Sequence, residues 1–234
     1  MNEQILWNRP QFPAQLNMSH PLTRGLVGCW LLNDTGGLRA WDSSPYGNHG
    51  LLTNFASPPK RPFNGLLFDG VNDVVNLGNA QSLQIVNKIT IEIWFIMNAW
   101  TGYWILCTNG IDTFWTIRLN VDTVKIQAYI QQADDILVTA GTAMLLTTRR
   151  WYQHVSVIDG AGYQAYIDGQ KDGTATAWSG AIKTTTNNIL VGARSDNFGP
   201  FDGSIGLIRI WKDRALFPSE VRQLYQDPYG MILK

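Results

Sequence analysis

The sequence predicts an all-β protein built from two packed antiparallel sheets, with one short helix near the C-terminus. Short runs of alternating apolar and polar residues recur along the 234-residue chain, and most end at Gly, Asn or Asp. Two turns, Asp159-Gly160 and Asp168-Gly169, have the composition of tight hairpins. Helical periodicity is confined to the segment after Pro218, so the strands lack crossover helices and are expected to pair in antiparallel fashion.

The expected elements begin with an extended N-terminal arm at residues 1–24, whose prolines and lack of periodicity favour neither strand nor helix. We expect this arm to lie over the sandwich or over a neighbouring molecule. Residues 25–234 form the sandwich domain, with a first core strand at 25–32 and a helix that ends before Asp227-Pro228. Between them, strands are expected at 66–68, 74–77, 89–97, 103–107, 113–119, 124–130, 136–139, 151–158, 163–167, 188–191 and 204–211.

The composition is that of a globular protein with an ample core. Hydrophobic residues make up 45% of the chain and charged residues only 15%, so aromatic side chains remain for the surface. The net charge of +0 gives no electrostatic reason to bind nucleic acid or an anionic membrane, and it suits a protein that lives in an assembly. No apolar run approaches the roughly 20 residues that span a bilayer.

Two smaller features concern the compartment of the protein. Residues 1–4 open without the basic and apolar regions of a signal peptide, so we expect that any role outside a cell relies on another route of export. Cys29 and Cys107 each lie in an apolar run, where cysteine acts as a small hydrophobic residue. Two buried free thiols are favoured over one disulfide bridge.

Four segments, taken in order, carry a resemblance to a known family. They are residues 25–30, 42–50, 67–75 and 203–216. Together they resemble the laminin G-like jelly-roll domains of the concanavalin A-like lectin and glucanase superfamily, over residues 25–226. The resemblance implies a two-sheet antiparallel jelly-roll sandwich. The two ends of the chain are most similar to members encoded among phage virion structural genes, which implies an oligomeric capsid or tail decoration protein at the virion surface.

Catalytic residues are not indicated by the sequence. Glucanases of this superfamily need two carboxyl groups about 5 Å apart on one face of a strand. The chain has three glutamates, of which only Glu92 lies in an expected core strand, and alternation predicts that it faces outward. The histidines lack the spacing of a zinc site, and we find no nucleophile elbow or phosphate-binding loop. We therefore expect no enzyme activity. A glucanase ranks third, after a structural module and a glycan-binding module.

Calcium is the one cofactor that the resemblance implies. It assigns Asp42, Asn48 and the backbone carbonyl of His49 to a single Ca²⁺, with Asp202 as a further ligand. These are the oxygen donors that a hard cation requires. Ile205-Gly206 stands where many relatives have Ile-Asp, which removes one carboxylate from such a site. The alternative is that Asp42 binds backbone N–H groups in an Asx-turn and holds no metal.

Surface aromatics are the candidates for carbohydrate binding, because the face of a pyranose ring packs on an aromatic ring. The residues in or beside expected loops are Trp100, Tyr103, Trp104 and Phe198. Packing in the core or at a subunit interface is the alternative for each of them. The sequence thus favours a non-catalytic structural module that docks on itself or on virion proteins through its N-terminal arm. A calcium-assisted module that binds cell-surface glycans is the second hypothesis.

Overall fold

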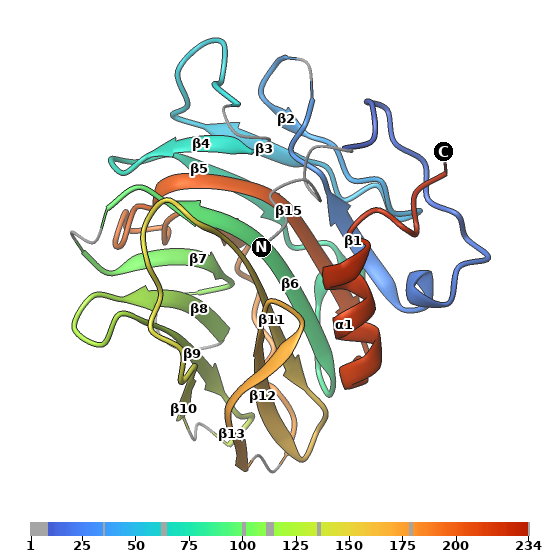
Figure 1. The fold of residues 1–234 in the computed structure, drawn as a ribbon, viewed down its shortest axis with the longest axis vertical. Coiled ribbons are helices and arrows are strands. Elements are labelled where there is room, and N and C mark those ends of the chain that lie inside the picture. Colours follow the sequence, from blue (N-terminus) through green and yellow to red (C-terminus); the bar gives the residue numbers. More distant parts are fainter. Residues whose placement is uncertain are drawn as a thin grey trace.

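The computed structural model describes residues 9–34, 36–61, 65–99, 102–110, 115–134, 137–177 and 180–233. These residues form two antiparallel sheets packed face to face, with the helix α1 (Pro218–Gln226) beside one of them (Figure 1). The predicted fold class is therefore confirmed. Within the described residues, no helix has both the length and the apolar character that crossing a bilayer requires.

A seven-stranded sheet has the order β1-β15-β6-β11-β12-β13, and β4 also pairs with β15. Its strands are β1 (Leu26–Trp30), β4 (Leu66–Asp69), β6 (Ile89–Met97), β11 (Trp151–Ile158), β12 (Gly162–Ile167), β13 (Gln170–Ala177) and β15 (Asp202–Lys212).

An eight-stranded sheet has the order β10-β9-β8-β7-β14-β5-β3-β2. Its strands are β2 (Arg39–Ala40), β3 (Gly50–Thr53), β5 (Val74–Gly78), β7 (Trp104–Thr108), β8 (Trp115–Asn120), β9 (Lys125–Gln131), β10 (Leu137–Gly141) and β14 (Ile189–Val191). Two 3-10 helices, η2 (Pro21–Thr23) and η4 (Gln81–Leu83), lie in connecting segments.

Every expected strand corresponds to a strand of the structure, and three further strands, β2, β3 and β13, were not expected. The Asp168-Gly169 turn has positive φ at both residues, 51° and 75°, and joins β12 to β13 as a hairpin. Strand β13 itself was not expected, because its exposed sequence has few apolar residues. Strands β2 and β3 were also missed, since they are short and flank a turn-rich segment.

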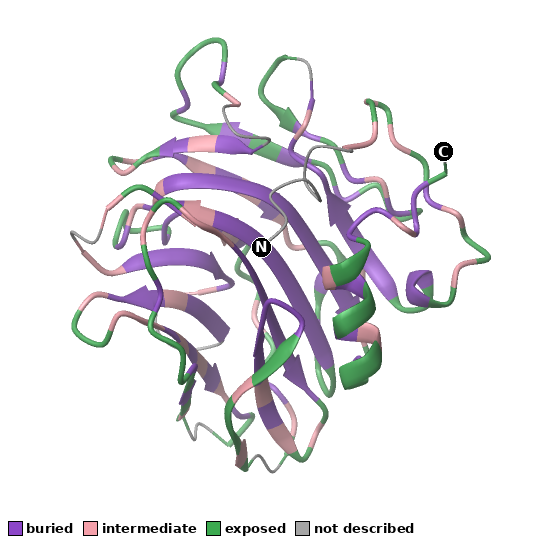
Figure 2. Cartoon of the chain, in the orientation of Figure 1, coloured by how far each residue is buried: buried purple, intermediate pink, exposed green. Residues whose placement is uncertain are grey.

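The core between the two sheets follows from alternation along the strands. Ile91, Ile93 and Phe95 of β6 point inward, as do Ile126 and Ile130 of β9, and all are buried. Figure 2 shows the central strands of both sheets as largely buried. Cys107 lies in this core and Cys29 lies on the other side of the seven-stranded sheet; both are buried free thiols, as expected.

A second apolar cluster covers the outer face of the seven-stranded sheet. Val221 and Leu224 of α1 pack there together with the chain after the helix and with residues of the N-terminal arm. In the arm, Leu16 pairs with Ile232, and the Leu22 carbonyl accepts a 2.7 Å hydrogen bond from Trp211 Nε1. Residues of the described part of the arm, 9–24, thus pack on the sandwich of the same chain.

Glu92 points outward from the seven-stranded sheet, as alternation predicted. The second apolar cluster covers it there, so its side chain is fully buried. Its Oε2 lies 2.9 Å from Arg209 Nη1, and both side chains are 0% exposed. Its Oε1 accepts hydrogen bonds from Trp94 Nε1 at 2.9 Å and Gln153 Nε2 at 2.7 Å. The alternation of β6 did not reveal that the C-terminal segment covers this face.

The inner core contains a polar chain that makes stability depend on pH. His154 Nε2 lies 2.8 Å from Ser156 Oγ, which lies 3.2 Å from the Tyr163 hydroxyl. Burial lowers the pKa of His154 from 6.5 to about 3. The folded protein therefore keeps His154 neutral at a pH where the unfolded chain binds a proton.

We expect this histidine to contribute a loss of stability on acidification. The contribution is absent above pH 6.5 and grows as the pH falls toward 3, at up to about 1.4 kcal/mol per pH unit, or about 2 kcal/mol at pH 5. Urea unfolding between pH 7.5 and 4.5 measures it, with His154→Gln as the control that flattens the slope. A His154 that titrates near its ordinary pKa in the folded protein by NMR would contradict the prediction.

Candidate functional site

The outer face of the eight-stranded sheet is polar because β8 and β9 alternate strictly. Trp115, Ile117 and Leu119 of β8 point into the core, which leaves Thr116, Arg118 and Asn120 on the outer face. In β9 the outer residues are Lys125, Gln127, Tyr129 and Gln131. The register places Arg118 opposite Gln127 and Thr116 opposite Tyr129.

These facing residues form a hydrogen-bonded network around Gln127. Its Oε1 accepts hydrogen bonds from Asn120 Nδ2 at 2.7 Å, from Arg118 Nη2 at 3.2 Å and from the Tyr129 hydroxyl at 3.2 Å. Arg118 also donates to the Tyr129 hydroxyl, and its guanidinium lies 4.3 Å from the centre of the Tyr129 ring. The network fixes the Arg118 side chain against the sheet.

Two loop aromatics lie next to this network. Tyr103 precedes β7, and the guanidinium of Arg118 lies 4.9 Å from its ring centre. The Tyr103 ring stacks on Phe198, with ring centres 6.4 Å apart and an interplanar angle of 27°. The Tyr103 hydroxyl donates to Asp122 Oδ2, and this hydrogen bond raises the tyrosine pKa. Both rings are therefore held in position on the surface.

A second arginine completes the row on the far side of Phe198. The guanidinium of Arg194 lies 4.4 Å from the Phe198 ring centre. Arg194 donates to both carboxylate oxygens of Asp196, at 3.1 and 2.7 Å, and these hydrogen bonds lower the pKa of Asp196. We call the five residues Arg194, Phe198, Tyr103, Arg118 and Tyr129 the aromatic strip.

Gly199 allows the two loops of the strip to approach each other. It has φ of +65°, and its carbonyl accepts a 2.8 Å hydrogen bond from the backbone N–H of Ile105. A Cβ at this position would lie 2.9 Å from the Tyr103 carbonyl oxygen. A side chain there would therefore push apart the loops that carry Phe198 and Tyr103.

A groove of about 420 Å³ adjoins the strip and shares Arg194 with it. Its walls carry the amide side chains of Asn54, Asn72, Asn76 and Asn197, and Val74 and Leu190 also line it. Two of the amides are held in place: Asn54 Nδ2 donates to the Asn72 carbonyl at 2.9 Å and Asn197 Nδ2 to the Val71 carbonyl at 3.1 Å. We call this the amide groove.

The structure brings together two of the four aromatics that the sequence singled out. Tyr103 and Phe198 form the centre of the strip. Trp104 is a correction: it is 3% exposed and packs on Phe201 in the core, because it is the first residue of β7 and faces the other way from Tyr103, which precedes the strand. Trp100 lies outside the described residues.

The residues proposed for calcium are engaged with one another and with the backbone. Asp42 Oδ1 accepts 2.8 Å hydrogen bonds from the N–H groups of Cys29 and Ser44. Its Oδ2 accepts from Ser44 Oγ at 2.6 Å and from the N–H of Asn48 at 2.8 Å. Asn48 Nδ2 donates to the Val27 carbonyl at 2.8 Å. Asp42 therefore forms an Asx-turn, and both of its carboxylate oxygens accept hydrogen bonds.

The other two members of that calcium set are the backbone carbonyl of His49 and the carboxylate of Asp202. His49 Nδ1 accepts a 3.1 Å hydrogen bond from the N–H of Asp42. Asp202 begins β15 and accepts a 2.7 Å hydrogen bond from Asn98 Nδ2, whereas Trp30, the bridge partner of Asp42, pairs with Ile208 of that strand. Six residues of strand separate these positions by about 20 Å. Asp202 therefore lies apart from Asp42, Asn48 and His49 in this arrangement.

In the part of the chain that the structure describes, no three His, Cys, Asp or Glu side chains are grouped as a metal site.

The sequence matches a laminin G-like family model, described as the concanavalin A-like lectin/glucanases superfamily, over residues 69–222. This match spans more than half of the chain. The chain belongs to this superfamily. No curated protein sequence matches this chain.

Solved structures share the fold of this superfamily member at low sequence identity. The binding domain of Paraclostridial Mosquitocidal Protein 1 is 14% identical, with a TM-score of 0.65 over 89% of this chain and 53% of that one. A Trypanosoma rangeli sialidase complex is 17% identical, with a TM-score of 0.67 over 98% of this chain and 38% of that one. Domain 4 of AbnA, an extracellular arabinanase from Geobacillus stearothermophilus, was solved with arabinotriose. It is 18% identical, with a TM-score of 0.63 over 86% of this chain and 98% of that domain.

These likenesses establish the fold of the superfamily member. It spans about half of the mosquitocidal binding domain and about a third of Trypanosoma rangeli sialidase chains. The activities of those longer proteins are properties of their own chains.

Proposed function

We propose that this lectin-like sandwich is a non-catalytic carbohydrate-binding module, and that its glycan lies along the aromatic strip and the amide groove. One observation carries the proposal: Tyr103 and Phe198 are stacked on the surface between two fixed arginines, beside a groove walled by asparagines. The presence of the same fold in a toxin binding domain and in an arabinanase domain solved with arabinotriose supports it.

The chemistry of the site suits an uncharged or weakly charged sugar. Aromatic rings pack against the apolar face of a pyranose, and amides and guanidinium groups bind its hydroxyls. Arg194 is paired with Asp196, and Arg118 lies over the Tyr103 ring, whose hydroxyl donates to Asp122. Because these side chains are fixed before the ligand arrives, less conformational entropy is lost on binding.

The non-catalytic part of the proposal rests on where the carboxylates lie. Glu92 is enclosed by Arg209, Trp94 and Gln153 and has no exposed surface. Hydrolysis of β-glucans that is lost in Glu92→Gln, with the fold retained, would favour a glucanase instead.

We expect Tyr103→Ala/Phe198→Ala to weaken glycan binding at least about tenfold, or about 1.4 kcal/mol, since it removes both ring faces on which the sugar packs. A panel of neutral oligosaccharides that includes arabinotriose identifies the ligand, and calorimetry then measures Kd. The matched control is Tyr46→Ala, which removes a ring that is 56% exposed elsewhere on the surface. Equal loss in both variants, or unchanged binding in the first, would contradict the proposed site.

Calcium assistance is tested in the same assay. The occupied oxygens of Asp42 predict that EDTA leaves Kd unchanged. A loss of binding in EDTA that calcium restores would support a metal site and would require this turn to open.

An assembly role, as a decoration protein at a virion surface, is the second candidate. The observation that favours it is an apolar patch at the β2 edge of the eight-stranded sheet, where Leu38 and Leu51 are 48% and 57% exposed. The unpaired backbone groups of an edge strand can pair with another chain, and an exposed apolar patch favours such contact. Light scattering over a range of protein concentrations tests self-association. An oligomer that dissociates in the Leu38→Ser/Leu51→Ser variant supports the assembly role. A monomer at every concentration opposes it.

A further inference from the structure

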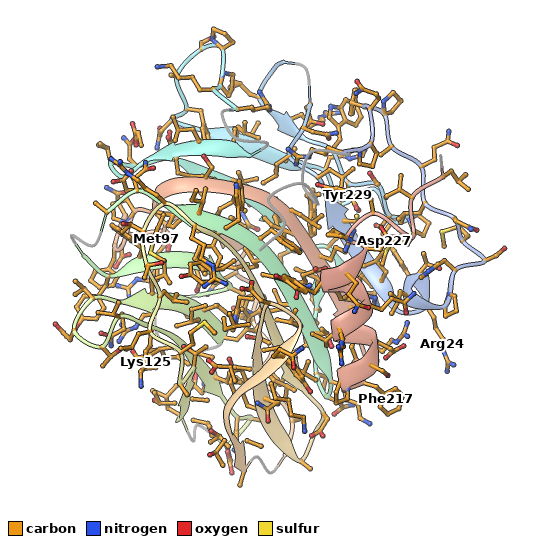
Figure 3. The ribbon with its side chains drawn as sticks, in the orientation of Figure 1. Arg24, Met97, Lys125, Phe217, Asp227 and Tyr229 are labelled. Atoms are coloured by element: carbon orange, nitrogen blue, oxygen red, sulfur yellow. The ribbon has the colours of Figure 1, made fainter. Side chains whose placement is uncertain are left out.

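A second and larger groove lies on the opposite side of the sandwich from the aromatic strip. Its volume is about 810 Å³, within the range of small-molecule sites. It is bounded by the first turn of α1, the β12–β13 hairpin and the segment after β15. Figure 3 shows Phe217 and Arg24 at the same end of α1, where this groove opens.

The groove is lined by more cations than anions. Arg24, Lys88, Lys171, Lys212 and Arg214 contribute five positive charges, against the three carboxylates of Asp159, Asp213 and Glu220. The chain as a whole has a net charge of +0, so this excess is local. An excess of one sign inside a groove attracts ligands of the other sign.

Three of the cations are available to a ligand. Arg24, Lys88 and Lys171 are exposed, and none of their side chains is bonded to another residue that the structure describes. The other two are held in place: Lys212 Nζ donates to the Gln81 carbonyl at 3.0 Å, and Arg214 donates to the Pro21 carbonyl at 2.9 Å and to Glu220. Setting aside the Arg214–Glu220 pair leaves four cations against the carboxylates of Asp159 and Asp213, a local excess of two positive charges.

Two of the carboxylates are directed at the protein itself. Asp159 Oδ1 accepts 2.8 Å hydrogen bonds from the N–H groups of Ala161 and Gly162. Glu220 accepts from Arg214 and, at 2.8 Å, from the N–H of Phe217. These carboxylates shape the turn and the start of α1, so they oppose an anionic ligand less than free carboxylates would.

The lip of the groove offers an apolar surface as well. The Phe217 ring is 70% exposed, and the buried Leu216 lies next to it in the lining. A ligand that fits both features has an apolar face to lie on Phe217 and acid groups to meet the three free cations. Acidic sugars combine the two properties within one short segment.

We propose that this groove is a second ligand site, which binds an acidic oligosaccharide through its carboxylate or sulfate groups. The site is independent of the aromatic strip, since the two lie on the outer faces of different sheets. A nucleic acid fits less well, because nucleic-acid binding proteins typically neutralise about 6–10 phosphates and this groove has three free cations.

The test is calorimetry on the full chain with a hexauronate and a sulfated hexasaccharide, in 50 mM and 300 mM NaCl. We expect one or both to bind, and we expect Lys88→Gln/Lys171→Gln to weaken that binding at least about tenfold. We also expect higher salt to weaken binding to the parent chain, because ion pairs at an open groove are screened. The two acids distinguish carboxylate from sulfate recognition.

The control variant Lys60→Gln/Lys125→Gln removes the same charge outside the groove and is expected to keep the parent Kd. Tyr103→Ala/Phe198→Ala is also expected to keep the parent Kd for the two acids. The proposal for the aromatic strip and the proposal for this groove can therefore fail independently. No binding of either acid, equal loss in both lysine variants, or loss only in the strip variant would overturn the proposal. Tighter binding of a 12-nucleotide single-stranded DNA than of both acids, lost in the same groove variant, would overturn the ligand class.

Discussion

Arg209→Met is expected to destabilise the protein by about 3–5 kcal/mol, the cost of leaving a buried charge without its partner. Arg209 and Glu92 are both 0% exposed and form an ion pair between β15 and β6, beneath the C-terminal segment. Arg209 also donates to the Pro228 carbonyl and so ties the chain after α1 to the sheet. The variant removes both interactions while methionine retains most of the apolar stem. Urea unfolding at pH 7 measures the loss.

The double variant Glu92→Gln/Arg209→Met separates charge from packing. Glutamine keeps an acceptor for Trp94 and Gln153 and carries no charge, so we expect the double variant to be more stable than Arg209→Met alone. If Arg209→Met costs less than about 1 kcal/mol, water or another cation reaches Glu92, and the buried pair is not a determinant of this fold.

Much of the fold was predictable because it depends on local signals. Alternation in residues 89–97 and 151–158 determined both strands and their inward faces, and the Asp168-Gly169 turn determined a hairpin. The cover over Glu92 was not predictable in this way. It depends on contacts between residues far apart in sequence, such as Leu16 with Ile232 and Leu22 with Trp211. No periodicity within one segment carries that information.

The aromatic strip was predictable only in part, for a similar reason. Tyr103 and Phe198 were identified as aromatic residues beside loops, but their stacking joins residues 95 positions apart. Arg118, Tyr129 and Arg194 were missed, although alternation in residues 115–120 and 125–131 already placed Arg118 and Tyr129 on an outer face. The missing information was the register of the two strands, which puts Arg118 opposite Gln127. Alternation also offered the signal that Trp104 faces away from Tyr103.

Removal of residues 1–24 is expected to destabilise the sandwich by roughly 5 kcal/mol, a large share of the 5–15 kcal/mol typical of a domain. Leu16 and Leu22 are 7% and 2% exposed, and burial of each leucine contributes about 1.5–3 kcal/mol. The deletion also removes the carbonyl that accepts from Trp211 Nε1 and the pairing of Leu16 with Ile232. We expect a lower melting temperature and exposed apolar surface, measured by calorimetry and dye binding.

A shorter deletion, of residues 1–8, is the control, because it leaves every described contact of residues 9–24 in place. The comparison also decides how the assembly hypothesis is tested. If the arm is part of the fold, loss of an oligomer after removal of residues 1–24 reports unfolding of the second apolar cluster rather than loss of a docking segment. Loss of an oligomer after removal of residues 1–8, with the melting temperature unchanged, would instead assign docking to those residues. If the longer deletion melts at the parent temperature, the cover formed by residues 9–24 is dispensable and the arm is free to engage another molecule.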